Sequence, residues 1–149
     1  TENGPKVIEY NCRFGDPETQ VVLPLLKSDL LTVMQAVTNG THSETPVEFS
    51  SGNACCVVMA SKGYPVAYEK GYEIDIPDEI KDSVYVAGAA KKDGRLVTSG
   101  GRVLGVTAVE DTLEKAVSSA YKKAEKIHFG NAFYRHDIGA KALAAREEK

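Results

Sequence analysis

The chain of 149 residues has no tryptophan, only three cysteines and no apolar run of membrane-spanning length. Three cysteines, of which Cys55 and Cys56 are adjacent, make a poor disulfide framework and favour a reducing compartment, so we expect a cytoplasmic protein. No Cys/His spacing typical of zinc occurs. A net charge of −3, with no long block of Lys or Arg, argues against a nucleic-acid-binding surface. We therefore expect no nucleic-acid partner and no membrane partner.

The first 43 residues are predicted to contain one strand and two helices. Residues 6–13 alternate apolar and polar side chains, as a strand does. A short helix is expected over 17–23, because Pro24 removes a backbone donor and clashes one turn back. A second helix is expected over 28–39, with its first residue, a serine, as cap and Gly40 as its end.

The rest of the chain has the pattern of a β-rich domain. The polar segment 41–46 separates helical from strand-like patterning, so we place a boundary there, with 1–43 as one unit and 44–149 as the second. We expect an α+β fold whose curled or barrel-like sheet is covered by helices. Its predicted elements are strands at 54–60, 84–86, 95–98 and 102–108, a helix capped by Asp111 or Thr112, and a last helix at 138–146.

The most informative stretch is the predicted strand with the turn after it. Because strand side chains alternate between faces, Glu9, Asn11 and Arg13 share one face. Carboxylate and amide oxygens are ligands that Mg²⁺ prefers. Arg13 could hold a phosphate or a carboxylate with its guanidinium fork. A solvated edge strand would show the same alternation, and Arg13 could instead pair with Asp16 or Glu18, so the residues alone leave these alternatives open.

Four runs of sequence, in this order along the chain, resemble one enzyme family. They are Glu-Tyr-Asn-Cys-Arg-Phe-Gly-Asp-Pro-Glu-Thr-Gln at 9–20, Val-Val-Met-Ala-Ser-Lys-Gly-Tyr-Pro at 57–65, Thr-Ser-Gly-Gly-Arg-Val-Leu at 98–104 and Tyr-Arg-His-Asp-Ile-Gly at 134–139. The family is that of glycinamide ribonucleotide synthetase (phosphoribosylamine–glycine ligase), whose members are ATP-grasp enzymes of purine biosynthesis. The resemblance spans nearly the whole chain.

This resemblance implies a fold and an activity. It implies the end of an ATP-grasp domain followed by a C-terminal domain, and an ATP-dependent ligase that joins glycine to 5-phosphoribosylamine through glycyl phosphate. It implies that Glu9 and Asn11 bind Mg²⁺ or Mn²⁺ and that ATP is the co-substrate. Arg13 is the predicted catalytic residue. Small molecules (ATP, glycine and 5-phosphoribosylamine) are the implied partners.

The same resemblance implies that the chain is a piece of a longer protein, and we expect it to have no ligase activity by itself. Two departures from the family pattern limit the implied substrate contacts: Val66 stands where the family usually has Gly, and Val86 where it usually has His. A different class of function would be a non-catalytic β-rich interaction module with a degenerate ATP-grasp tail. That module would have no reason to keep Glu9, Asn11 and Arg13 together.

The predicted boundary leads to a proteolysis experiment. Segment 41–46 should be the first internal site that a protease cuts, and residues 47–145 should persist as a folded core, because loops between domains expose their backbone. Mass spectrometry of a limited digest would identify the cuts. An earlier cut inside 57–108 would contradict the division.

Overall fold

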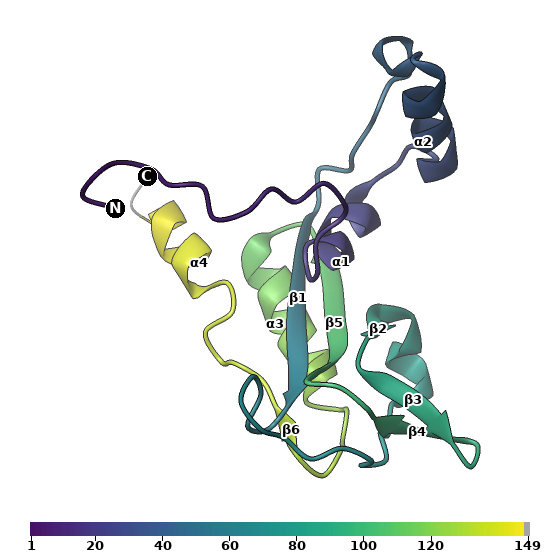
Figure 1. Ribbon diagram of the computed structural model, residues 1–149, viewed down its shortest axis with the longest axis vertical. Coiled ribbons are helices and arrows are strands. Elements are labelled where there is room, and N and C mark those ends of the chain that lie inside the picture. Colours follow the sequence, from purple (N-terminus) through teal and green to yellow (C-terminus); the bar gives the residue numbers. More distant parts are fainter. Residues whose placement is uncertain (148–149) are drawn as a thin grey trace.

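The computed structural model of the chain describes residues 1–147 as a mixture of short helices and antiparallel strands (Figure 1). In chain order the elements are α1 Thr19–Val22, the 3-10 turn η1 Leu23–Leu25, α2 Leu30–Asn39, η2 His42–Glu44, β1 Asn53–Ser61, η3 Asp78–Ser83, β2 Val84–Val86, β3 Ala89–Lys92, β4 Arg95–Thr98, β5 Arg102–Glu110, α3 Leu113–Ala124, β6 Ala132–Phe133 and α4 Ala140–Glu147. The predicted α+β class is confirmed.

The main sheet has four antiparallel strands in the order β2-β5-β1-β6, so it is open, with β2 and β6 at its edges. Strands β1 and β5 form its centre and pair over almost their whole length, with Val57 opposite Val106 and Met59 opposite Leu104. The register shifts between Met59 and Ala60. The predicted strands at 54–60, 84–86, 95–98 and 102–108 are all present.

Two strands were missing from the sequence prediction. The hairpin partner β3 pairs with β4 through a turn in which Asp93 and Gly94 have φ angles of 49° and 79°, the left-handed values that a tight hairpin turn requires. Strand β6 has only two residues, which pair with the end of β1. Neither strand carries a strong local pattern of its own, because β3 is Ala-Ala-Lys-Lys and β6 is Ala-Phe.

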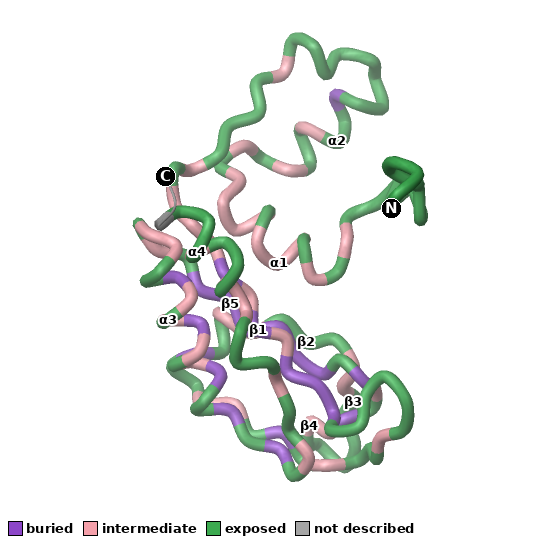
Figure 2. Tube along the Cα trace, turned by 90° about the vertical axis from the view of Figure 1, so that its left-hand side faces the viewer, coloured by how far each residue is buried: buried purple, intermediate pink, exposed green. Residues whose placement is uncertain are grey.

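The core lies between one face of β1 and β5 and the helix α3 (Figure 1). Ala116, Ala120 and Ala124 recur every four residues on α3 and are completely buried. Their small side chains let the helix approach the strands closely, and the larger Val, Met and Leu side chains of the strands fill the space. Thr112 caps α3 by accepting a hydrogen bond from the Lys115 amide, as predicted. Figure 2 shows the buried residues gathered along β1, β5 and the inner side of α3.

The opposite face of the two central strands holds α1. Here the hydroxyl of Thr107 donates to the carbonyl oxygen of Gln20 at 3.1 Å. A Cβ atom on Gly105 would lie 3.1 Å from the sulfur of Cys56 and 3.7 Å from Cγ of Gln20. The missing side chain of Gly105 therefore makes room for the first helix to lie against the sheet.

Helix α2 projects away from the sheet at the end of an arm (Figure 1). Its cap is Asp29 rather than the predicted serine one residue earlier, because Asp29 Oδ1 accepts from the Thr32 amide at 2.7 Å. It ends at Gly40, which has a φ of 73°, as predicted. At the base of the arm the chain pairs with itself, since the Lys27 amide donates to the Glu48 carbonyl at 2.9 Å.

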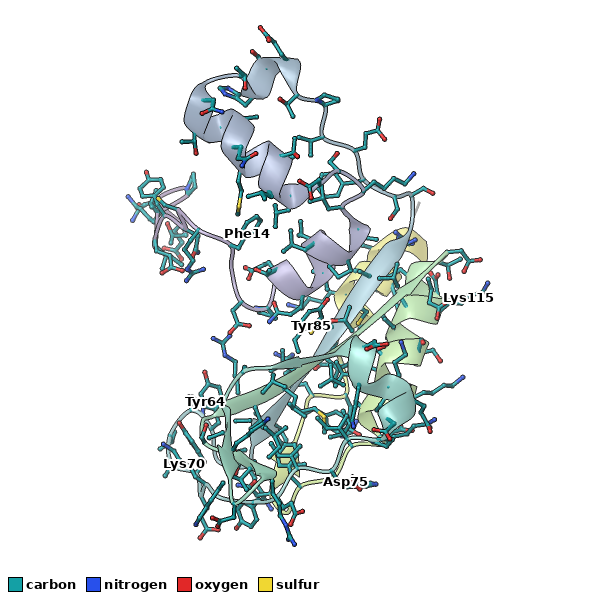
Figure 3. The ribbon with its side chains drawn as sticks, turned by 90° about the vertical axis from the view of Figure 1, so that its right-hand side faces the viewer. Phe14, Tyr64, Lys70, Asp75, Tyr85 and Lys115 are labelled. Carbon is teal, nitrogen blue, oxygen red and sulfur yellow. The ribbon has the colours of Figure 1, made fainter. Side chains whose placement is uncertain are left out.

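The predicted strand at 6–13 is wrong for this chain. Residues 5–14 are extended but form no ladder with any other segment of the described residues. The side chains expected to pack are exposed instead, with Ile8 at 98% and Tyr10 at 82% of their full surface. A strand is held by hydrogen bonds to a neighbouring strand, and the described residues supply no neighbour here. Figure 3 shows the segment that ends at Phe14 standing clear of the sheet.

Among the described residues, no helix combines the length and the apolar character that crossing a bilayer demands.

A substitution in the β1–β5 core should show how much of the stability depends on it. Leu104 is almost completely buried, so Leu104→Ala should lower the free energy of unfolding by about 2–5 kcal/mol through lost burial and a cavity. Urea titration followed by circular dichroism would measure the change. The matched control on the same strand is Val109→Ala, a half-exposed position where less than about 1 kcal/mol is expected. Equal losses at both positions would contradict this description of the core.

Candidate functional site

The three residues predicted as site residues lie on the extended N-terminal segment. The Asn11 amide donates to Oε1 of Glu9 at 3.0 Å, so these two side chains lie together. The guanidinium of Arg13 donates to the carbonyl oxygen of Phe14 at 3.2 Å. Within residues 1–147 no ion pair joins Arg13 to Asp16 or Glu18, the alternative that the sequence left open.

The chemistry of this pair suits a hard divalent cation. Glu9 offers carboxylate oxygens and Asn11 an amide oxygen, both of the kind that Mg²⁺ prefers, and both side chains are exposed. Mg²⁺ requires about six oxygen ligands, and in the described part of the chain no group of three or more His, Cys, Asp or Glu could hold a metal. The donor set therefore fits this ion as a partial site, whose other ligands would be water, a bound phosphate or residues outside this chain.

Asp16 attaches the N-terminal segment to the sheet domain. Its Oδ2 atom lies 3.0 Å from Nη2 of Arg102, the first residue of β5, and its backbone carbonyl accepts from Nη1 of the same guanidinium at 2.9 Å. Its other carboxylate oxygen, Oδ1, accepts from the side-chain amide of Gln20 at 2.9 Å. Asp16 does not cap the short helix that follows it. In the structure that helix has Glu18 at its N-cap position, and its side chain makes no capping hydrogen bond.

Beside this attachment lies a hollow of about 410 Å³. It is bounded by the start of the first helical segment, the outer face of β1 and the loop between β6 and α4, and its surface is mainly apolar. Its lining residues are Pro17, Cys56, Val58, Ala60, Tyr64, Arg102, Phe133, Tyr134, Arg135 and Ile138. Sequence reasoning missed this hollow, because its lining comes from five separate stretches of the chain. Among these residues, Tyr64 is half-exposed.

The glycine turn before β5 is a structural turn. The amides of Ser99 and Gly100 both donate to the carbonyl oxygen of Gly88, at 2.8 and 2.9 Å, so these two donors are not free to bind an anion. A Cβ atom on Gly101 would lie 2.0 Å from the ring of Tyr64. The glycines here permit close packing of backbone and ring, which favours the plain turn over a phosphate-binding loop.

Two cations line the hollow, and both have acidic partners. Arg135 donates to both carboxylate oxygens of Asp137, at 2.8 and 2.6 Å, and forms an ion pair just before the last helix. The hydrogen bonds from Arg135 hold the pKa of the Asp137 carboxyl below its usual value. Arg102 is occupied by Asp16. A ligand in this hollow would therefore meet apolar surface and paired charges.

Cys56 forms part of the floor of the hollow. Burial raises the pKa of the Cys56 thiol; hydrogen bonding with Thr107 opposes this rise in part, and the nearby Asp16 carboxylate adds to it. Burial also raises the pKa of Cys55, which faces the core on the other side of β1. Both thiols are therefore protonated at neutral pH and are poor nucleophiles.

Sequence comparison matches residues 54–141 to the family described as phosphoribosylglycinamide synthetase, C domain. A phosphoribosylamine–glycine ligase of Caldanaerobacter subterraneus is 50% identical over 94% of this chain, which spans 34% of that relative. The human trifunctional purine biosynthetic protein adenosine-3 is 51% identical over 97% of this chain, which spans 15% of that protein. A crystal structure of phosphoribosylamine–glycine ligase from Thermotoga maritima matches with a TM-score of 0.74 and 46% identity, over 90% of this chain and 33% of that one.

The open antiparallel sheet, its covering helix and these matches first define a class: an α+β domain that forms one part of a longer enzyme chain in its relatives. The family match covers more than half of the 149 residues. The chain belongs to the phosphoribosylglycinamide synthetase family and contains its C domain. It spans about a third of the length of the ligases that it matches.

The cysteines allow a direct test of the hollow and of the exposed segment. At pH 7.5 iodoacetamide should modify the exposed Cys12 first, and Cys56 should react roughly tenfold or more slowly, because its thiol is partly buried and burial raises its pKa. Peptide mass spectrometry over a time course would give both rates. In urea the two rates should converge, which serves as the control. Equal rates in the folded protein would show that the floor of the hollow is open.

Proposed function

We propose that this chain is the C-terminal part of an ATP-dependent ligase. The intact enzyme would join glycine to 5-phosphoribosylamine through a glycyl phosphate intermediate, and would form glycinamide ribonucleotide, ADP and phosphate. The observation that carries this proposal is the 50% identity over 94% of the chain to a protein named phosphoribosylamine–glycine ligase. That match covers 94% of the chain, so it extends well beyond the C domain at residues 54–141.

The chemistry of the N-terminal segment supports the residue roles that we propose. Glu9 and Asn11 would each give one oxygen to Mg²⁺ or Mn²⁺, which when bound would offset the negative charge of the ATP phosphates. Arg13 projects a guanidinium that forms no ion pair within the described residues. Its fork could hold a transferred phosphate or the carboxylate of glycine, which would bring the reacting groups together.

Exposed apolar side chains support the view that a longer protein covers the N-terminal part of this chain. Ile8 and Tyr10 on the extended segment, and Leu31 and Val37 on α2, are all largely exposed. Such side chains gathered on one part of a molecule are typical of a surface that packs against something else. The end of an ATP-grasp domain, separated from the rest of that domain, would present such a surface.

We also propose a cytoplasmic location and small-molecule partners for the intact enzyme. All three cysteines are free thiols in the structure, as a reducing compartment would keep them. The apolar hollow and the exposed Glu9–Asn11 pair suit small ligands. ATP, glycine and 5-phosphoribosylamine are the proposed substrates.

Substitution of the metal ligands in the longer ligase tests this proposal. Glu9→Ala should lower the turnover rate roughly a hundredfold, equivalent to about 3 kcal/mol of lost transition-state stabilisation, because an anionic ligand is removed. Asn11→Ala removes a neutral ligand and should lower the turnover rate less than Glu9→Ala does. Added Mg²⁺ should partly restore the turnover rate of Asn11→Ala. ADP release that depends on glycine and 5-phosphoribosylamine is the measurement.

The matched control is Glu44→Ala, an exposed carboxylate on the α2 arm, which should leave turnover unchanged. The isolated 149-residue chain should release no ADP, because one exposed segment cannot hold ATP. Near-normal turnover of Glu9→Ala at limiting Mg²⁺ would show that Glu9 is an ordinary surface carboxylate. Loss of folding in either site variant, seen by circular dichroism, would contradict the expected exposure of these side chains.

A further inference from the structure

The segment that carries Glu9, Asn11 and Arg13 has few connections to the sheet domain. From residue 5 to residue 14 it makes no backbone hydrogen bond to the sheet within the described residues. Its first attachment is Asp16, three residues after Arg13. The position of the whole segment relative to the sheet therefore depends on how Asp16 is held.

Arg102 balances the charge of the Asp16 carboxylate and also fixes the orientation of the Asp16 residue. One guanidinium nitrogen contacts the carboxylate at 3.0 Å and the other donates to the backbone carbonyl of the same residue at 2.9 Å. A planar guanidinium that binds side chain and main chain together restrains the peptide unit itself. Gln20 occupies the second carboxylate oxygen at 2.9 Å, so both oxygens of Asp16 have a donor.

The base of this contact is rigid. Arg102 begins β5, its carbonyl accepts from the Gly88 amide at 2.8 Å, and it lies opposite Ala60 of β1. A second hydrogen bond joins β5 to α1, because the Thr107 hydroxyl donates to the carbonyl of Gln20 at 3.1 Å. We name Asp16, Gln20, Arg102 and Thr107 the clamp.

We propose that Arg102 is a positioning residue for the ligase reaction: through Asp16 it fixes the Glu9–Arg13 segment relative to the C domain. The inference rests on the proposed function. Arg102 does not touch Glu9 or Asn11, and its role is to keep their oxygens and the Arg13 guanidinium in one place. The C domain thus contributes to metal binding without supplying a ligand, as outer residues around metal ligands do in other proteins.

The first experiment measures the clamp in the 149-residue chain, independently of activity. Arg102→Met should speed hydrogen exchange of the Thr19–Val22 amides roughly three- to tenfold, since a half-exposed, charge-assisted contact is lost. Exchange in β1 and α3 should stay unchanged. The control is Arg95→Met, which breaks the exposed ion pair of Arg95 with Glu73 on the β3–β4 side. Unchanged exchange at 19–22 in Arg102→Met would overturn the clamp.

The second experiment measures the consequence in the longer ligase. Arg102→Met should raise the Mg²⁺ concentration for half-maximal activity roughly tenfold, with the KM for 5-phosphoribosylamine unchanged. Arg102→Lys should raise the Mg²⁺ concentration for half-maximal activity less than Arg102→Met does, but should not return it to the value of the unchanged protein. The reason is that an ammonium group cannot bind carboxylate and carbonyl in one plane. Asp16→Asn should resemble Arg102→Met, and the double variant should be no worse than either, because the two residues act as one unit.

Other outcomes identify other roles. A raised KM for 5-phosphoribosylamine with unchanged Mg²⁺ dependence would show that Arg102 binds the substrate phosphate, and would overturn the positioning role. A loss of thermal stability alone, matching that of Arg95→Met, would show an ordinary structural ion pair. If the longer protein has no ligase activity at all, the proposed function fails, and the positioning role fails with it, while the exchange result still decides whether the clamp exists.

Discussion

The antiparallel pairing of β1 with β5 is the interaction on which the rest of the structure depends. Two nine-residue strands lie side by side, and because their side chains alternate, one register decides what faces each layer. Val57, Met59 and their partners meet α3 on one side. Cys56, Gly105 and Thr107 meet the first helical segment on the other. A shift of one residue would exchange these two faces.

The same pairing locates the chemistry. After the register shift between Met59 and Ala60, Arg102 stands at the end of the sheet opposite Ala60, beside the hollow and within reach of Asp16. The sheet domain thus offers an apolar surface and a fixed guanidinium, whereas the polar groups that suit a metal and a phosphate lie on the extended segment.

Elements with strong local signals were predictable. The apolar run of β1, the Thr112 cap of α3 and the end of α2 at Gly40 each depend on neighbours a few residues away. Strands β3 and β6 were not predictable in this way, because Ala-Ala-Lys-Lys and Ala-Phe become strands only when a partner strand lies beside them. The strand at 6–13 was predicted from alternation alone and is absent in this chain, because alternation does not supply the neighbour that holds a strand.

The sequence by itself determined the α+β class, the family resemblance and the candidate residues Glu9, Asn11 and Arg13, because residue types and short spacings carry that information. Only the tertiary structure decided that Asp16 is bound by Arg102, which lies 86 residues further along the chain. It also decided that the Ser99 and Gly100 amides donate to the Gly88 carbonyl and that ten residues from separate stretches line one hollow. The physical reason is that such contacts depend on how distant segments pack, which no local pattern records.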